Sequence, residues 1–225
     1  MEDTKKSLSG DSQIKSKERV STHGEVVTAD REVNAMLDLV KQETERIDSR
    51  FLEPACGNGN FLAKILERKL VITKKFYSHS RAEYELFTLI AVASLYGIEI
   101  QEDNVEECRE RLYHIFLQEY SSLFTDTINK EYISSIQYIL KRNILWGDAL
   151  TLQTPDGVKP IIFSEWSAIN GLIKRRDFTS DNLLKNQPME GPNHFSDMGE
   201  EAFIPTPIKE YPPIHYLKIY SHADN

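Results

Sequence analysis

The feature that most constrains this chain is a pair of glycines between an apolar stretch and an amphipathic one. An apolar start at Phe51 leads into the segment Glu53–Phe61, in which Gly57 and Gly59 are separated by one residue. The amphipathic segment Phe61–Leu66 follows directly. Glycine adopts backbone conformations that other residues avoid, and it lets a ligand approach the main chain. This order of residues therefore predicts a strand, a tight turn and a helix around a binding loop.

Length and composition limit the class of protein. A chain of 225 residues with 40% hydrophobic and 28% charged residues can form one sizeable soluble domain with extensions. The 27 basic and 35 acidic residues give a net charge of −8, which argues against strong independent binding to DNA. The two cysteines are too few for a disulfide framework, and the scattered histidines favour no metal site. No apolar run approaches the roughly 20 residues that span a bilayer, so we expect a cytoplasmic protein without a membrane partner.

Helical and extended patterns alternate along the chain. Apolar residues at helical spacing predict helices at residues 31–46, 60–70, 81–95, from 103 onward and 130–141. Asp30 and Asp103 are the predicted N-caps of the first and fourth of these helices, and Lys74–Phe76 is a predicted connector. Short apolar runs predict strands at residues 50–54, 96–100, 143–146 and 160–163. This alternation predicts an α/β fold, a doubly wound Rossmann-like parallel sheet with helices on both faces. Ligands bind such sheets at the carboxyl ends of the strands.

The composition changes twice along the chain. Residues 1–19 are polar and mixed in charge, which predicts a disordered tail. Residues 20–165 contain the alternating pattern and form the predicted ligand-binding domain. Residues 166–225 hold six of the nine prolines and predict an irregular C-terminal extension that lies over the domain or contacts a partner.

Three acidic residues each follow a predicted strand. Glu53, Glu99 and Asp148 should meet along one edge of the sheet. A carboxylate after the second strand can accept two hydrogen bonds from ribose hydroxyls, and one after the third can accept a hydrogen bond from the amino group of adenine. Together the three acids predict a pocket for an adenosine compound.

The details of the loop favour S-adenosylmethionine (SAM) over a dinucleotide. Leu62 stands where the third glycine of the dinucleotide pattern would fall. Glu53 suits the ammonium group of a methionine moiety and would repel a pyrophosphate. The Gly-Lys-Ser/Thr end of a phosphate loop is missing, which disfavours hydrolysis of nucleoside triphosphates.

Four segments carry a family resemblance in their order along the chain. His23–Thr28, Glu53–Phe61, Gly97–Ile100 and Gly147–Leu150 resemble the SAM-dependent adenine-specific DNA methyltransferases of restriction-modification systems, over about residues 20–163. Ala29 departs from the proline that usually follows the threonine in that family. The resemblance implies SAM as the cofactor. The residues that it places around SAM are Thr28, Glu53, Ala55, Gly57, Gly59, Asn60, Glu99, Ile100, Asp148 and Ala149.

The catalytic signature of that family is missing from the chain. The family has Asp/Asn-Pro-Pro-Tyr/Phe after the fourth strand, whereas here the run 160–163 continues as Ser164–Ser167. In one interpretation Glu165 and Trp166 replace the acid and the stacking aromatic residue. The favoured alternative places Trp166 in the core and Glu165 in solvent. The basic run Lys174–Arg176 could contact phosphates or form a solvated turn.

Two functions remain open from the sequence. The first is methylation of the amino group of adenine in DNA, in a restriction-modification or defence context, with a partner subunit that reads the target and supplies the missing signature. The second is a catalytically inactive SAM-binding subunit that regulates or assembles with a protein partner or with another copy of itself. A methyltransferase acting on small molecules or proteins is less favoured.

Overall fold

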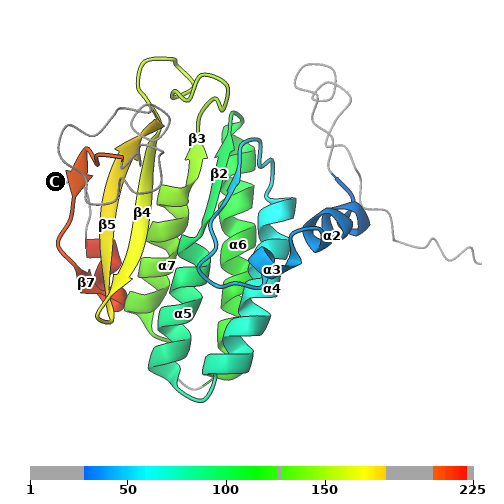
Figure 1. Ribbon diagram of the computed structural model, residues 1–225, viewed down its shortest axis with the longest axis vertical. Helices are drawn as coiled ribbons and strands as arrows, with labels where there is room; N and C mark the ends of the chain where they lie inside the picture. Colours follow the sequence, from blue (N-terminus) through cyan, green and yellow to red (C-terminus); the bar gives the residue numbers. More distant parts are fainter. Residues whose placement is uncertain (1–27, 126–127, 181–204, 222–225) are drawn as a thin grey trace, which may run out of the picture.

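The computed structural model describes residues 28–125, 128–180 and 205–221. Its centre is a parallel sheet of β1 (Phe51–Glu53), β2 (Leu95–Glu99) and β3 (Ile144–Trp146) in the order β1–β2–β3. The chain is therefore a mixed α/β protein with a parallel sheet, as the alternating pattern predicted, and this arrangement is compatible with a Rossmann-like fold (Figure 1).

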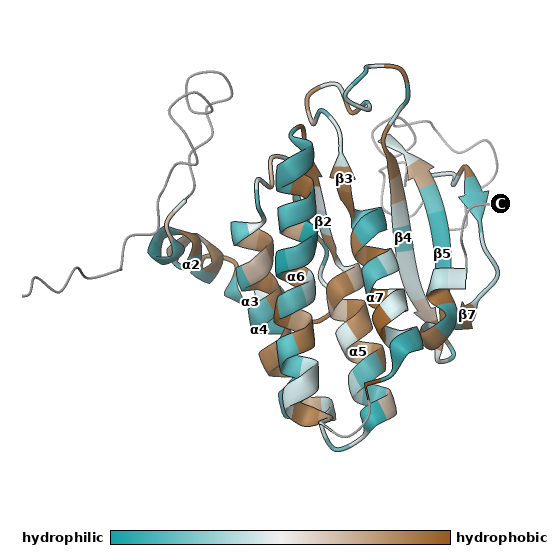
Figure 2. Ribbon diagram, turned by 180° about the vertical axis from the view of Figure 1, so that it is seen from behind, coloured by the Kyte–Doolittle hydropathy of each residue, from teal (hydrophilic) through white to brown (hydrophobic). Residues whose placement is uncertain are grey.

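Four long helices pack around the central strand β2. They are α4 (Asn60–Tyr77), α5 (Arg81–Ala93), α6 (Glu102–Leu123) and α7 (Lys130–Asn143). The apolar residues of α5 and α7 form part of the core, where Leu89, Val92, Ile136 and Ile139 have no exposed surface. Figure 2 shows apolar residues along both helices in brown. Two short helices, α2 (Asp30–Asp38) and α3 (Lys41–Thr44), precede the sheet.

The run at residues 160–163 does not become a fourth parallel strand, so that prediction is wrong. It leads instead into β4 (Ile162–Ile169), which pairs antiparallel with β5 (Leu172–Thr179). Asn170 and Gly171 connect the two strands with φ angles of 51° and 78°. Two consecutive residues with positive φ form the tight turn that suits the twist of an antiparallel hairpin, and Asn-Gly is the sequence that favours it.

Several predicted helix boundaries are also wrong. Residues 31–46 form two helices rather than one, and α4 continues through Lys74–Phe76, the predicted connector. Asp30 and Asp103 lie inside the first turns of α2 and α6 rather than at their N-caps, which are Ala29 and Gln101. Acidic residues in a first turn interact favourably with the helix dipole without capping the helix.

Residues 205–221 are attached to the core. The strands β6 (Lys209–Glu210) and β7 (Ile214–His215) pair with β5, and the 3-10 helix η2 (Tyr216–Ser221) packs against α7. The hydroxyl of Tyr216 donates a hydrogen bond to the buried Glu85 at 3.0 Å. The boundary predicted between residues 165 and 166 falls inside β4, and the predicted tail at residues 1–19 lies outside the described residues. Among the described helices, none has the length and apolar character needed to cross a membrane.

Candidate cofactor-binding site

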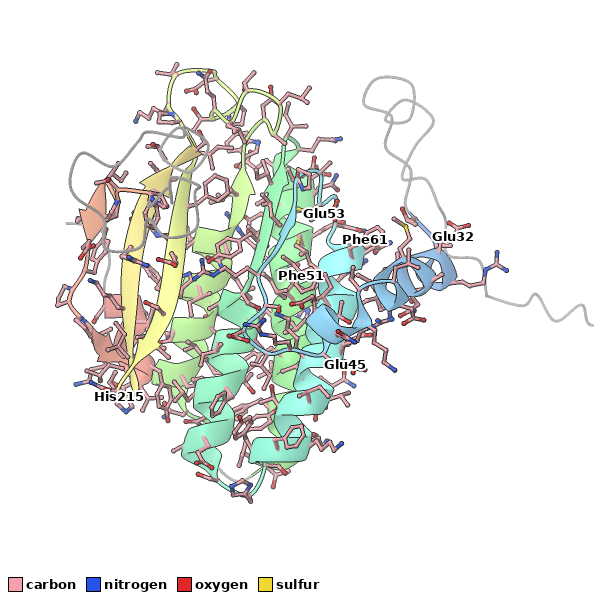
Figure 3. The ribbon with its side chains drawn as sticks, viewed as in Figure 1. Glu32, Glu45, Phe51, Glu53, Phe61 and His215 are labelled. Atoms are coloured by element: carbon pink, nitrogen blue, oxygen red, sulfur yellow. The ribbon has the colours of Figure 1, made fainter. Side chains whose placement is uncertain are left out.

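The loop after β1 folds back over the end of β2. The Cys56 N–H donates to the carbonyl of Ile98 at 3.0 Å, and the Gly59 N–H donates to the carbonyl of Cys56 at 2.8 Å. Gly57 and Gly59 have φ angles of 51° and 86°, both in the left-handed region that favours glycine. This turn starts α4 at Asn60 (Figure 3 shows Glu53 at the end of β1 and Phe61 at the start of α4).

The two loop glycines serve different purposes. A Cβ on Gly59 would lie 2.6 Å from the Sγ of Cys108 in α6, so this position needs glycine for close packing within the protein. A Cβ on Gly57 would have no atom within 4 Å. Gly57 therefore has open space beside it, and a ligand can approach its backbone.

Glu99 is held at the end of β2 by two backbone donors. Its Oε2 accepts from the Gly57 N–H and its Oε1 accepts from the Gln101 N–H, both at 2.9 Å. The residue is only 8% exposed. Each carboxylate oxygen has two lone pairs, so both oxygens keep the capacity to accept a second hydrogen bond.

The other two acids lie after the neighbouring strands. Glu53 is paired in register with Gly97 of β2, and burial raises the pKa of its carboxyl group. The Gly147 N–H donates to the carbonyl of Glu99 at 2.9 Å, which brings the following residue, Asp148, to the same edge. One oxygen of Asp148 accepts from the Leu150 N–H at 2.8 Å and stabilises the local turn. The structure thus brings the three acids to the ends of adjacent strands, while their roles in binding stay predictions.

Asn60 links the N-terminal segment to the loop. Its side-chain amide donates to the carbonyl of Thr28 at 3.0 Å, and Arg111 of α6 donates to its amide oxygen. Thr28 therefore lies beside the start of α4, while its role near the methionine end of SAM stays a prediction. Residues 23–27 of the same motif lie outside the described residues.

The sequence reasoning missed an exposed aromatic residue at this edge. The indole Nε1 of Trp146 donates to the carbonyl of Ile100 at 2.9 Å. Trp146 is 43% exposed and Ile100 is 50% exposed, so two apolar side chains face solvent next to Glu99. The available signal was an aromatic residue immediately before Gly147 and Asp148, at the end of a predicted strand.

Cys56 has the environment of a packing residue. Both Cys56 and Cys108 are buried free cysteines. A hydrogen bond with Cys108 and burial raise the pKa of the Cys56 thiol. Because the thiolate is the nucleophilic form, this environment disfavours covalent catalysis by Cys56.

The two weak catalytic candidates lie in different surroundings. Trp166 is 8% exposed, and its indole donates to Asn143 Oδ1 at 2.8 Å, so it is a core residue and cannot stack on a base. Glu165 forms ion pairs with Arg50, at 2.6 Å, and with Arg176. The expectation that Glu165 is solvated is therefore wrong.

The basic run is also not a solvated turn. Lys174–Arg176 lies in β5, and Arg175 has no exposed surface. The guanidinium of Arg175 pairs with Asp177 at 2.5 Å.

Comparisons with known proteins point to one distant relationship. Over 97 residues, 41% of this chain, the sequence is 30% identical to a protein of Methanocaldococcus jannaschii that is named as a candidate type II restriction enzyme and methyltransferase. The match spans 8% of that protein, so the chain corresponds to a small part of it. No family model matches the chain, and no solved structure matches it. The similarity supports a distant relationship to a restriction-modification methyltransferase.

Proposed function

We propose that this chain binds SAM at the carboxyl edge of its parallel sheet and acts as a DNA methyltransferase-type protein in a restriction-modification context. The observation that carries the proposal is the position of Glu99. Two backbone N–H groups orient its carboxylate beside the open side of Gly57, and both oxygens can still accept hydrogen bonds from ribose hydroxyls.

The neighbouring residues suit the other parts of SAM. The exposed side chains of Ile100 and Trp146 provide an apolar surface for the adenine ring. The second oxygen of Asp148 is the candidate acceptor for the adenine amino group. Glu53, at the end of β1, is the candidate partner of the methionine ammonium group.

The chemistry of such a site is direct methyl transfer. An amino nitrogen of the acceptor attacks the methyl carbon, the bond from that carbon to sulfur breaks, and the nitrogen releases a proton. Catalysis rests mainly on alignment of donor and acceptor. Because the chain lacks the Asp/Asn-Pro-Pro-Tyr/Phe signature, we propose that a partner subunit reads the DNA target and completes the catalytic site.

Calorimetric titration with SAM tests the pocket. Glu99→Ala should weaken SAM binding roughly tenfold or more, because it removes charge-assisted hydrogen bonds. Glu110→Ala, an exposed acid on α6, is the matched control and should bind SAM like the parent protein. Equal SAM affinity of the Glu99 variant and the parent would refute the assigned pocket.

One observation favours a second function, that of a SAM-binding subunit without catalytic activity. Trp166, the only aromatic candidate that the sequence offered for stacking on a base, is a core residue. A tritiated-methyl assay on mixed DNA, with and without the product of the neighbouring gene, separates the two functions. Methyl transfer under either condition supports the enzyme, and SAM binding without transfer under both supports the regulatory subunit.

A further inference from the structure

A groove runs between the outer edges of β1 and β4. Two cavities of about 590 and 600 Å³ lie along it, and Arg50 lines both of them. On the side of β4, residues 166–168 line the first cavity and residues 163–165 line the second. A consecutive run of β4 therefore borders the groove, and its length corresponds to roughly 20 Å of extended chain.

Both strands that border the groove are edge strands. Among the described residues, β1 pairs only with β2, and β4 pairs only with β5. No strand ladder of the described residues therefore joins the two sheets across the groove. An edge strand presents a row of unpaired backbone N–H and C=O groups, which can pair with another extended chain.

The hydrogen bonds of β1 show which of its backbone groups point into the groove. The Phe51 N–H donates to the carbonyl of Ser94, just before β2, at 2.9 Å. In a strand, the backbone groups of successive residues point to opposite sides. The N–H and the C=O of Leu52 therefore point away from β2 and toward the groove.

The same alternation gives the direction of the backbone groups in β4. The carbonyl of Arg175 in β5 accepts from the Tyr211 N–H at 3.0 Å, on the side of β6. The backbone groups of Arg176 therefore point toward β4, where this residue is paired in register with Glu165. It follows that the residues of β4 whose backbone groups point into the groove are Ser164, Trp166 and Ala168.

Two side chains already cross the groove. The hydroxyl of Tyr96 in β2 donates to the carbonyl of Ser164 at 2.9 Å, so this carbonyl does point away from β5. Arg50 pairs with Glu165 at 2.6 Å, and the side chain of Arg50 is 56% exposed. Because an exposed ion pair contributes little to stability, Arg50 can move aside for an entering segment at little cost.

The walls of the groove predict the side chains of such a segment. Ile90 and Ala93 of α5 line the groove and form an apolar wall. Leu52 is 53% exposed, so the groove is also open to solvent. A strand that lies between an apolar wall and solvent carries apolar side chains at every second position.

We propose that this groove binds an extended segment of a partner protein, which adds a strand between β1 and β4 and joins the two sheets. The inference rests on the proposed function, in which a partner completes the site, because β1 ends at Glu53 and the added strand would reach the same edge. Among its described residues, a second copy offers only strands that are already paired, so we assign the segment to a different protein. Main-chain hydrogen bonds supply the affinity, and the apolar wall selects the alternate side chains.

A library of linear peptides displayed on phage, selected on the full chain, tests the groove. The peptides have about twelve residues, which is enough to cover the eight residues of β4. We expect the selected peptides to share apolar residues at every second position. The affinity of one selected peptide, made synthetically and labelled, is then measured by fluorescence anisotropy.

Ala168→Pro tests pairing with the main chain of β4. It removes one N–H that points into the groove, and an edge strand tolerates proline at such a position. We expect the affinity for the peptide to fall roughly tenfold. Ala168→Ser keeps the N–H, is the matched control and should bind like the parent. If Ala168→Pro does not fold, Leu52→Pro removes the corresponding N–H of β1 and should weaken binding to a similar extent.

The outcomes separate this inference from the proposed function. The inference is overturned if no binding peptide emerges, or if the peptide binds Ala168→Pro as tightly as it binds the parent. Binding of SAM that depends on Glu99 would leave the proposed cofactor site standing in either case. Conversely, binding of the peptide that depends on Ala168, in a protein that does not bind SAM, supports the groove and refutes the cofactor site.

Two further measurements test the other possible occupants. A dimer of the parent in sedimentation equilibrium that is lost in Ala168→Pro would assign the groove to a second copy. A synthetic peptide of residues 181–204 that displaces the selected peptide from the groove would assign it to the chain itself. Either result overturns the assignment to a partner protein, whereas a monomer that ignores the 181–204 peptide supports it.

Discussion

The parallel sheet and the β4–β5 hairpin hold their polar groups in different ways. At the edge of the sheet, Glu99 accepts one backbone hydrogen bond on each oxygen and keeps capacity for more. In the hairpin, the buried Arg175 pairs with Asp177 through two hydrogen bonds and donates to the hydroxyl of Tyr138. The ring of Tyr211 lies 4.3 Å from the same guanidinium.

This difference separates polar groups that could still bind a ligand from polar groups that are satisfied within the protein. A buried polar group that is satisfied within the protein stabilises one packing arrangement, whereas one with spare capacity can bind a ligand. The loss of an acid from the sheet edge should therefore cost less stability than the loss of a charge from the buried pair of the hairpin. The hairpin should lose stability when either partner of its buried pair is removed.

Breaking the buried pair of the hairpin should have the largest effect. Arg175→Met leaves Asp177, which is 4% exposed, without its charged partner, and should lower the free energy of unfolding by roughly 3–5 kcal/mol. Urea denaturation followed by circular dichroism measures this change. Lys174→Met is the control in the same strand, because its pair with Glu210 is more exposed, and it should cost about 0–1 kcal/mol. Similar losses in the two variants would contradict the structural role of Arg175.

The second-largest effect should come from the glycine loop at the carboxyl edge of the sheet. Gly59→Ala places a Cβ 2.6 Å from the Sγ of Cys108 and forces alanine to a φ of 86°. Steric overpacking and left-handed strain together should cost roughly 2–4 kcal/mol in thermal or urea unfolding. The double variant Gly59→Ala with Cys108→Ala should recover only the part of the lost stability that comes from the steric overlap.

Gly57→Ala is the control for this prediction. Its φ of 51° is strained for alanine, but no atom lies within 4 Å of the new Cβ. We expect a cost of about 1 kcal/mol. A loss as large as that of Gly59→Ala would show that both glycines are needed for packing, and that the space beside Gly57 is not reserved for a ligand.

The same contrast explains what the sequence could and could not predict. The parallel strands and the glycine loop depend on residues that are close together in sequence, so these elements could be predicted from the sequence pattern. The hairpin depends on pairing of β4 with β5 through Asn170 and Gly171. Asn-Gly favours a hairpin turn, and the prediction of a fourth parallel strand did not include this signal. The burial of Arg175 arises from rings of α7, β4 and the segment before β7, which no local pattern reveals.

The position of the three acids in the candidate site could be predicted from the sequence, whereas their roles in binding stay predictions. Each acid ends or follows a strand, and a parallel sheet brings such ends together. Trp146 was missed because strand-end aromatic residues are usually core residues, and its exposure depends on the packing of the following loop. A cavity of about 600 Å³ between β1 and the β4–β5 hairpin could not be predicted, because it requires the position of a hairpin that was not expected.

The smallest effect concerns a buried lysine at the opposite, amino end of the parallel strands. The Nζ of Lys69 donates to the carbonyls of Ile47 and Ser49, at 3.1 Å and 2.5 Å, and to the hydroxyl of Ser94 at 2.5 Å. Burial lowers the pKa of Lys69 to about 7. The group therefore links the segments before β1 and β2, and it makes the stability of this region depend on pH.

The sign of this dependence follows from proton uptake on unfolding. The pKa of an unfolded lysine is about 10.4, so between pH 7 and about pH 10 the unfolded chain binds a proton that the folded chain lacks. The free energy of unfolding should rise by about 1 kcal/mol per pH unit between pH 7 and pH 9, and the dependence should vanish below pH 6, where both states are protonated. Lys69→Met is the control and should show a flat profile over the same range. A parent profile as flat as that of Lys69→Met would mean that the three acceptors keep Lys69 charged, and that the sheet region, like the hairpin, stabilises its buried cation within the protein.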